Sequence, residues 1–246
     1  MDDPDLSGRT VLVTGSAKGL GREILLATAA RGATTAVHYH TSADAAREVA
    51  EIARDRGVAA VTTVQADVTD PDSVDGLFAA VESELGSVDV LVNNVGDFAP
   101  AHWEDLDFET WNRVLETNVN GTYLCSKRAL GPMRENGFGR IVNIGYASAE
   151  NALVSPKNFP YFLAKTGVIM FTRMLAADTR DDGITVNAVS PYVVENSDEF
   201  PDDLPRGRPA TFEDVTRPVL FFADPETEYV SGENLEVDGG WLPETV

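Results

Sequence analysis

An apolar, β-branched segment at residues 10–15 (TVLVTG) runs directly into a turn that carries Gly15, Gly19 and Gly21. Such a segment is typical of a buried strand, and the apolar residues from 22 to about 30 recur with helical spacing. Glycine lets the backbone leave the usual φ/ψ regions and approach a ligand closely. A strand, a glycine turn and a helix in this order direct backbone N–H groups and a helix N-terminus at a phosphate. The stretch therefore predicts a dinucleotide-binding turn.

The rest of the chain repeats this alternation of strand and helix. We expect strands at residues 34–40, 58–66, 88–94, 139–145, 185–190 and 234–238, and helices at 43–56, 71–85, 108–136, 159–178 and 212–223. The alternation indicates a parallel, doubly wound sheet with helices on both faces. We expect one Rossmann-like α/β domain over residues 1–246, with about seven parallel strands. The polar, proline-containing residues 192–210 are expected to form a substrate loop or lid.

The net charge of the chain argues against two classes of partner. The chain has 40 acidic and 19 basic residues and a net charge of −21. A negative surface repels nucleic acid and anionic membranes, so neither is expected as a partner. The single Cys125 and the absence of a signal peptide or a long apolar run favour a cytoplasmic protein. The dispersed acidic excess leads to the hypothesis of a halophilic source, where salt screens the self-repulsion.

Tyr161 and Lys165 stand four residues apart in a segment expected to be a helix, so their side chains share one face. A phenol with a pKa near 10 is a poor acid or base at neutral pH. A neighbouring ammonium lowers that pKa, and such a pair can exchange a proton with a substrate oxygen. Surface packing is the alternative explanation for the spacing taken alone.

The end of the second strand bears on the choice of cofactor. An acidic residue there would accept hydrogen bonds from an adenosine ribose and repel a 2′-phosphate. The nearest one, Asp44, lies past the strand, and donors for a phosphate are present instead: Lys18, His40 and Ser42. NADP(H) is therefore favoured over NAD(H), which is not excluded. For His38 and His40, polarity at a strand edge without a function is the alternative.

Taken in order, the motifs resemble those of the short-chain dehydrogenase/reductase family over nearly the whole chain. The motifs are TGSAKGLG at 14–21, Asp67, NNVG at 93–96, Asn118 in TNVNG, Tyr161-x-x-x-Lys165, and Pro191 after the sixth strand. The resemblance implies hydride transfer with a nicotinamide cofactor. It implies that Tyr161 is the general acid in reduction, that Lys165 bonds the nicotinamide ribose, and that Asn118 fixes a helix kink and a water in the proton relay.

The expected cofactor contacts combine the family's pattern with the donors named above. They are Gly15, Lys18, Gly19, Leu20, Gly21, His40, Ser42, Asp67, Val68, Asn94, Gly96, Tyr161, Lys165, Pro191 and Val194. No metal is expected. The resemblance also implies a homo-oligomer, a dimer or a tetramer, formed through the helices at 108–136 and 159–178.

The chain departs from the family's pattern beside the expected active site. The family usually has Ser directly after strand five, where its hydroxyl holds the substrate carbonyl. This chain reads Gly145–Tyr146 there, and Ser148 follows, thirteen residues before Tyr161. Ser148 is slightly preferred as the carbonyl-holding residue because of that spacing, and Tyr146 is the alternative. Tyr192 follows Pro191 where the family has Gly, and Asn196 stands where a cofactor-contacting Thr is usual.

Two substrate classes compete. The overall pattern resembles reductases of 3-oxoacyl thioesters, sugars or ketones, with Phe98, Tyr146 and Tyr192 as expected pocket residues. Residues 38–43 (HYHTSA) and Phe98 are also similar to pteridine reductases. Carbonyl reduction is the first hypothesis and reduction of a pterin the second. A non-catalytic, NADP(H)-binding regulatory protein is the third.

Overall fold

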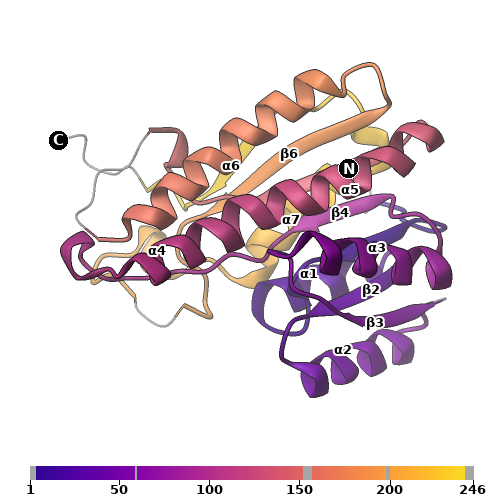
Figure 1. Ribbon diagram of the computed structural model, residues 1–246, viewed down its shortest axis with the longest axis horizontal. Coiled ribbons are helices and arrows are strands. Elements are labelled where there is room, and N and C mark those ends of the chain that lie inside the picture. Colours follow the sequence, from indigo (N-terminus) through magenta and orange to yellow (C-terminus); the bar gives the residue numbers. More distant parts are fainter. Residues whose placement is uncertain (1–3, 59, 152–156, 198–199, 242–246) are drawn as a thin grey trace.

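The computed structural model describes residues 4–58, 60–151, 157–197 and 200–241 (Figure 1). Within these ranges it forms one seven-stranded sheet, in which every neighbouring pair is parallel and the strand order is β3-β2-β1-β4-β5-β6-β7. The strands are β1 (Thr10–Val13), β2 (Thr34–Tyr39), β3 (Val61–Gln65), β4 (Val90–Asn93), β5 (Gly139–Ile144), β6 (Ile184–Pro191) and β7 (Asn234–Val237). The expected doubly wound sheet is thus confirmed.

Helices cover both faces of the sheet (Figure 1). They are α1 (Gly19–Ala29), α2 (Ala43–Asp55), α3 (Pro71–Leu85), α4 (Phe108–Leu115), α5 (Gly121–Asn136), α6 (Phe159–Asp178) and α7 (Phe212–Ala223). Helix α7 begins with a reciprocal capping box between Thr211 and Asp214. Such a box satisfies backbone donors that the first turn of a helix leaves without partners.

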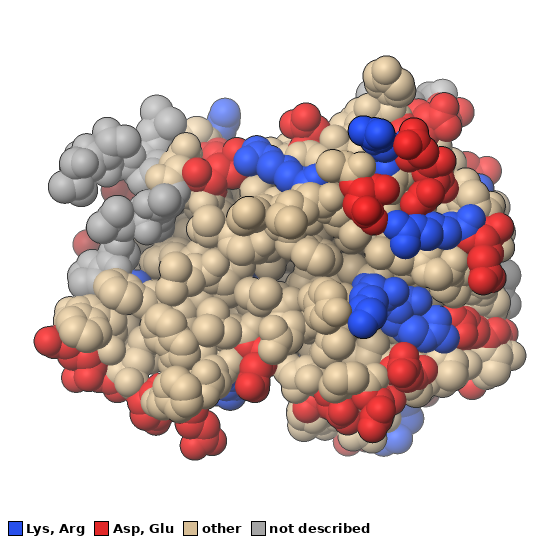
Figure 2. Space-filling model, turned by 45° about the horizontal axis from the view of Figure 1, so that its top comes forward, with Lys and Arg blue, Asp and Glu red and all other residues tan. Residues whose placement is uncertain are grey.

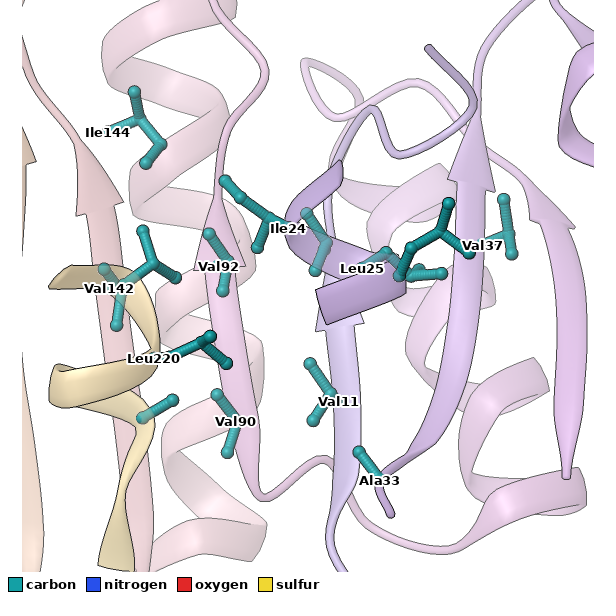
Figure 3. Close-up of a cluster of buried hydrophobic side chains, with 14 of the residues drawn as sticks. Val11, Ile24, Leu25, Ala33, Val37, Val90, Val92, Val142, Ile144 and Leu220 are labelled. Atoms are coloured by element: carbon teal, nitrogen blue, oxygen red, sulfur yellow. The ribbon is translucent and has the colours of Figure 1, made fainter. Parts of the chain in front are cut away.

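The two faces of the sheet build two separate cores. Val11 and Val13 of β1 point to the side covered by α1, α2 and α7, where Ile24 and Leu220 pack against them (Figure 3). Leu12, between them, points to the opposite side and joins the residues of α3, α5 and α6. Burial on both faces explains why these strands are continuous apolar runs, because alternate residues face two apolar layers.

The strand order reverses between β1 and β4, which are neighbours in the sheet although two strands separate them in the chain. In open parallel sheets a crevice forms beyond the carboxyl ends of the strands at such a switch point. The glycine turn after β1 and the NNVG motif after β4 both lie at this point. The topology therefore brings together two motifs that are about 75 residues apart in the sequence.

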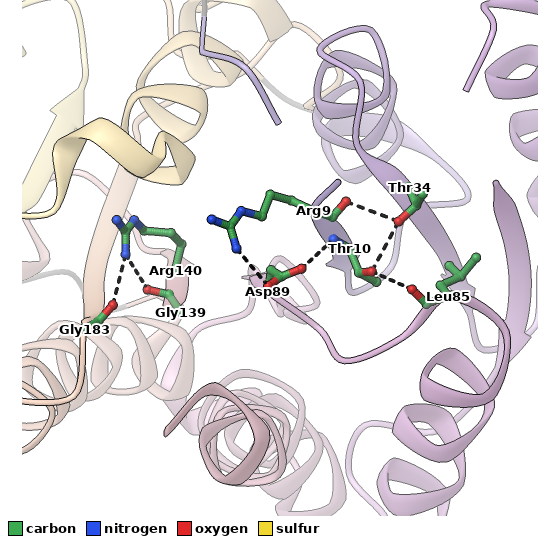
Figure 4. A network of polar contacts seen from close by, with 8 residues as sticks. All are labelled: Arg9, Thr10, Thr34, Leu85, Asp89, Gly139, Arg140 and Gly183. Atoms are coloured by element: carbon green, nitrogen blue, oxygen red, sulfur yellow. Dashed lines mark hydrogen bonds and ion pairs between the residues drawn. The ribbon is translucent and has the colours of Figure 1, made fainter. Parts of the chain in front are cut away.

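A polar network closes the opposite edge of the sheet, where the strands begin (Figure 4). The Asp89 carboxylate accepts from the Thr10 backbone N–H at 2.9 Å and pairs with Arg9 at 3.3 Å. The Thr10 hydroxyl donates to the carbonyl oxygen of Leu85 at 2.9 Å. The buried Arg140 guanidinium donates to backbone carbonyls, including that of Gly139 at 2.9 Å. These groups satisfy one another, so the network is structural and the open chemistry lies at the carboxyl edge.

The helix expected at 108–136 is interrupted. Helix α4 ends at Leu115, residues Glu116–Asn120 form a π-helical turn, and α5 begins at Gly121. A π-turn inserts one residue and is frequent at functional sites. It places Asn118 at the break. Other boundaries shift by one to three residues: α1 begins within the glycine turn, at Gly19, β3 begins at Val61, and β6 extends through Pro191.

The surface divides into charged and uncharged areas (Figure 2). Exposed apolar side chains on α5 and α6 belong to Tyr123, Leu163, Met170 and Met174, each at least 45% exposed. Ion pairs lie at the far ends of these helices, where Arg134 of α5 pairs with Asp178, the last residue of α6, and with Asp182. Within the described ranges, no helix has the length and hydropathy that crossing a membrane requires.

Candidate active site

The turn after β1 has no room for a side chain at its glycines. Gly15 and Gly19 adopt left-handed φ values of +66° and +54°. A Cβ atom on Gly21 would lie 2.5 Å from both the Gly15 carbonyl oxygen and Nδ2 of Asn94. Asn94 in turn donates from Nδ2 to the Thr14 carbonyl oxygen at 2.9 Å, which ties the turn to the end of β4. The turn thus forms a cradle of bare backbone that fits a pyrophosphate.

His38 supports this cradle from beneath. Its Nδ1 accepts from the Gly15 backbone N–H at 2.8 Å, and its Nε2 lies 3.1 Å from the Ala66 carbonyl oxygen. Accepting at Nδ1 and donating at Nε2 requires the neutral ring with its proton on Nε2. Burial lowers the pKa of His38 to about 4, in agreement with a neutral ring. His38 is 1% exposed, so it holds the turn and does not face a ligand.

Polar groups at the end of β2 are left open to solvent. His40 and Lys18 are exposed, and Ser42 precedes α2 without a capping hydrogen bond to the described helix. His40 Nε2 lies 4.0 Å from Oδ2 of Asp67. The other oxygen of Asp67 accepts from the backbone N–H and the hydroxyl of Thr69, at 2.9 and 2.7 Å. The carboxylate is therefore partly engaged by its own turn.

Asn118 and Lys165 converge on Gly96 after β4. A Cβ atom at Gly96 would collide with Oδ1 of Asn118 and would lie 3.2 Å from Nζ of Lys165. Nδ2 of Asn118 donates to the carbonyl oxygens of Asp97 and Val114, at 2.8 and 2.9 Å. Its Oδ1 is buried and accepts from no described group. This free acceptor fits a water or a ligand hydroxyl.

Lys165 reaches from α6 to the end of β5. Its Nζ donates to the Ile144 carbonyl oxygen at 2.7 Å, and the residue is 5% exposed. Burial lowers the pKa of Lys165 to about 8. An ammonium carries three protons, so two remain beyond the bond to Ile144. These protons suit hydroxyl groups of a ligand that lies against Gly96.

Tyr161 lies one helical turn before Lys165, and Nζ of Lys165 is 5.6 Å from the centroid of its ring. We expected the ammonium to lower the pKa of the phenol. Instead burial raises the pKa of Tyr161 above its ordinary value, and Tyr146 contributes to the rise. The ammonium is bonded to Ile144, so it does not offset the burial. The phenol therefore holds its proton at neutral pH, as a proton donor must before it reacts.

Aromatic side chains surround Tyr161. Phe98 and Tyr146 meet its ring edge-on, with centroids 5.1 and 5.6 Å away. Tyr146 also contacts Tyr192, at 6.2 Å. Tyr192 stacks on Trp241 with centroids 3.8 Å apart and an angle of 13° between the rings. All three expected pocket residues therefore belong to one aromatic wall, which consists of Phe98, Tyr146, Phe162, Tyr192 and Trp241.

The turn after β5 explains the departure from the family's Ser. A Cβ atom on Gly145 would collide with the Ser190 hydroxyl, so no side chain fits directly after the strand. Ser148 is buried with a left-handed φ of +64°, and its backbone N–H donates to Oε1 of Glu236 at 2.7 Å. The ring of Tyr146 contacts Tyr161. Both candidates for holding the carbonyl thus lie on one turn, and only Tyr146 has a described contact with Tyr161.

The segment after β6 lies beside the cofactor cradle. Val194 pairs with Ala210 in a short parallel bridge, which closes the base of the expected lid at 192–210. Nδ2 of Asn196 lies 3.0 Å from the position of a Cβ atom on Gly19. A cavity of about 620 Å³ lies between this segment, α7 and β7, and Tyr192 and Glu236 are among its lining residues. Residues 198–199 of the segment lie outside the described ranges.

The remaining expected cofactor contacts surround the same crevice. Leu20, half-buried at the start of α1, packs on the core, and Val68 is buried against Gly121. Pro191 ends β6. A cradle without side chains, a free buried acceptor on Asn118 and the spare protons of Lys165 fit a nicotinamide dinucleotide. Within the described residues, no cluster of His, Cys, Asp and Glu is arranged to hold a metal ion.

Two residues of the candidate site were not predicted from the sequence. Glu236 and Trp241 lie at the end of the chain, and neither belongs to a motif. Glu236 pairs in register with Ser190 of β6, and this pairing brings it to the turn after β5. Only the alignment of β7 on β6 reveals this contact, and no spacing in the sequence encodes it.

The chain is similar to known reductases and dehydrogenases, as the site geometry suggests. A family model described as enoyl-(acyl carrier protein) reductase matches residues 15–242. The 3-oxoacyl-[acyl-carrier-protein] reductase FabG of Staphylococcus aureus is 34% identical over 242 residues, 94% of this chain and 97% of that protein. Glucose 1-dehydrogenase 2 of Bacillus subtilis is 32% identical, with 96% and 95% covered. A crystal structure of a short-chain type dehydrogenase/reductase from Mycobacterium marinum has a TM-score of 0.88 at 30% identity and covers 96% of each chain.

The fold, the site and these similarities define an oxidoreductase built on a dinucleotide-binding sheet. The chain belongs to the short-chain dehydrogenase/reductase family.

Proposed function

We propose that the protein transfers a hydride between NADP(H) and a carbonyl or alcohol substrate, of the 3-oxoacyl thioester, ketone or sugar type. The convergence of Asn118 and Lys165 on Gly96, with the Tyr161 ring 5.6 Å from Nζ of Lys165, carries this proposal. The three side chains come from α6 and from the π-turn, and they meet at the carboxyl edge of the sheet beside the cradle. That is where a nicotinamide would lie if the pyrophosphate occupied the glycine turn.

The bound cofactor would supply the hydride. Tyr161 would donate its phenolic proton to the carbonyl oxygen, and its raised pKa supports the protonated form before reaction. Lys165 would use its spare protons on the nicotinamide ribose and stabilise the phenolate that Tyr161 becomes. Asn118 would hold, at its free Oδ1, a water that returns a proton towards Lys165 and Tyr161.

The preference for NADP(H) is supported by the exposed groups at the end of β2. Lys18, His40 and Ser42 would contact an adenosine 2′-phosphate there, and the sequence has no carboxylate at the strand end itself. We expect a higher kcat/KM with NADPH than with NADH. Lys18→Glu should lower kcat/KM for NADPH and leave that for NADH nearly unchanged. Equal loss with both cofactors would argue against a phosphate contact.

Pterin reduction is the second candidate, and Phe98 is the observation that favours it. Phe98 is 51% exposed and its ring stands beside Tyr161, where a flat heterocycle could stack on it.

The direct test is to follow NADPH oxidation at 340 nm with acetoacetyl thioester, a cyclic ketone and dihydrobiopterin as separate substrates. Turnover with a carbonyl compound is the expected result. Oxidation with the pterin alone would reverse the order of the two candidates, and NADPH binding without turnover of any substrate would contradict both.

A further inference from the structure

Helix α6 begins without the usual side-chain cap, although its first turn carries Tyr161. The residue before it, Asn158, adopts a left-handed φ of +61° and makes no side-chain capping hydrogen bond within the described part of the chain. The first turn of a helix has backbone N–H groups without intrahelical partners, and a missing cap weakens it. Tyr161 is the third residue of α6, so the position of its phenol depends on what else holds this turn.

The loop between β4 and α4 runs along the start of α6. Helix α6 lies beside α4 (Figure 1). The backbone N–H of Asn158 donates to the carbonyl oxygen of Ala101 at 3.2 Å. His102, the next residue of the loop, forms an isolated antiparallel bridge with Lys157. These backbone contacts tie the chain to the loop just before the helix begins.

Trp103 extends this connection into the helix itself. A one-turn 3₁₀ helix (Trp103–Asp105) presents its indole, which stacks on the ring of Phe159, the first residue of α6. The ring centroids are 6.1 Å apart and the angle between the rings is 17°. Aromatic rings at such a separation attract one another. Trp103 has no described ring contact with Tyr161, so its effect on the phenol passes through Phe159 and the helix backbone.

The other end of the same loop is anchored to the π-turn. Asn118 donates from Nδ2 to the Asp97 carbonyl oxygen at 2.8 Å, and the Asp97 backbone N–H donates to the Thr117 hydroxyl at 3.2 Å. The Asp97 carboxylate pairs with Arg113 of α4. The loop therefore connects the turn that carries Asn118 with the helix that carries the phenol.

We propose that Trp103 is a positioning residue for Tyr161, because its stacking on Phe159 holds the first turn of α6 in place. The inference rests on the proposed function, since it concerns the proton that Tyr161 donates. Proton transfer requires the donor and acceptor atoms to lie within hydrogen-bond reach. A misplacement of about 1 Å can lower a rate about 10²-fold. A ring pair that limits the movement of this turn therefore acts on kcat.

The test follows NADPH oxidation, with the better of the acetoacetyl thioester and the cyclic ketone as substrate. Trp103→Leu should lower kcat about 10- to 100-fold and leave the NADPH dissociation constant within about twofold, because the cofactor cradle lies on other segments. Phe159→Leu removes the other ring of the pair and should have the same effect. Trp103→Phe keeps a ring that can stack and should retain at least about half of the wild-type kcat.

A double-mutant cycle with Tyr161→Phe separates positioning from general damage. If Trp103 acts through the phenol, Trp103→Leu should lower the residual turnover of the Tyr161→Phe protein by less than about twofold, since no proton donor remains to be misplaced. Loss by the same factor in both backgrounds would overturn the inference. Phe108→Leu is the matched control, because Phe108 follows the same loop, is 77% exposed and has no described ring contact, and it should keep the wild-type kcat.

The remaining outcomes distinguish the inference from the proposed function. An unchanged kcat in Trp103→Leu, or equal losses in Trp103→Leu and Trp103→Phe, would overturn the inference and leave the proposed function standing. Undiminished turnover in Tyr161→Phe alone, or a wild-type protein that turns over neither carbonyl compound, would refute the proposed function, and the inference would fall with it.

Discussion

The imidazole of His38 links the sheet to the glycine turn. It accepts from the turn at Gly15 and donates to Ala66 at the end of β3. One neutral ring thus connects the carboxyl ends of β1, β2 and β3. In the sequence, His38 was as consistent with an idle strand edge as with a function, because alternation alone does not reveal which groups a buried ring bonds. The structure assigns it a supporting role.

His38 should make stability depend on pH. Its pKa is about 4 in the folded protein against 6.5 for the free side chain. Between these values the unfolded chain binds more protons, so the free energy of unfolding falls as pH falls from 6.5 to 4. The loss attributable to His38 should reach about 3 kcal/mol.

Urea unfolding at several pH values would measure this effect, with His38→Gln as the matched variant. A glutamine can accept and donate at one position without titrating, so the variant should lose less stability on acidification. Parallel pH profiles for the two proteins would refute the assignment.

The turn after β5 depends on a strand far away in the sequence. Glu236 of β7 accepts from the amide of Ser148, which is buried and has a left-handed φ. A left-handed conformation is unfavourable for a residue with a side chain, so an external partner is needed to hold it. Tyr146 stands two residues earlier on the same turn, against Tyr161.

Glu236→Ala should destabilise the protein by about 1–3 kcal/mol, because the buried N–H of Ser148 loses its acceptor. It should also lower kcat, since the turn that carries Tyr146 is released. Glu236→Gln keeps an acceptor oxygen and should retain most of the stability and activity. Chemical unfolding and steady-state kinetics of both variants would check this. Equal effects of Ala and Gln would show that charge, and not the hydrogen bond, is what matters.

At this scale the sequence predicted much of the fold. The buried runs at 10–15 and 139–145 predicted strands, because residues facing two cores must be apolar on both sides. It predicted one helix over 108–136, since a π-turn leaves the apolar spacing nearly unchanged. The role of Glu236 was not predictable, because it depends on the register of β7 against β6. The raised pKa of Tyr161 was not predictable either, because it follows from burial by rings from distant segments.

The charge of −21 acts on the molecule as a whole. Mutual repulsion of the carboxylates destabilises the compact state, and salt screens it. The free energy of unfolding should rise when KCl is raised from about 0.1 to about 1 M, as the screening length falls from about 10 to about 3 Å. Glu51, Glu84 and Glu135 are exposed and form no ion pair within the described part of the chain, and replacing them by Gln should flatten this dependence. Equal stability at both salt concentrations would remove the basis for the halophile hypothesis.

Exposed apolar side chains on α5 and α6 form a candidate face for assembly, and Nζ of Lys127 lies 5.5 Å from the centroid of the Tyr123 ring there. Met170 and Met174 are 64% and 62% exposed on α6, and Tyr123 is 45% exposed on α5. We propose that a second copy of the chain covers this face, because such side chains gain stability when they leave water. Met170→Asp should shift the protein from oligomer to monomer in analytical ultracentrifugation, while Tyr229→Asp should not. A monomeric wild type would contradict the proposal.

The proton transfer assigned to Tyr161 is tested most directly by Tyr161→Phe, which removes one oxygen atom and keeps the ring contacts with Phe98 and Tyr146. NADPH affinity, from fluorescence titration, should stay within about twofold, because the cradle is unchanged. Turnover of a carbonyl substrate should fall by about 10²- to 10⁴-fold, the contribution of a positioned general acid. Undiminished turnover in this variant would contradict the assignment.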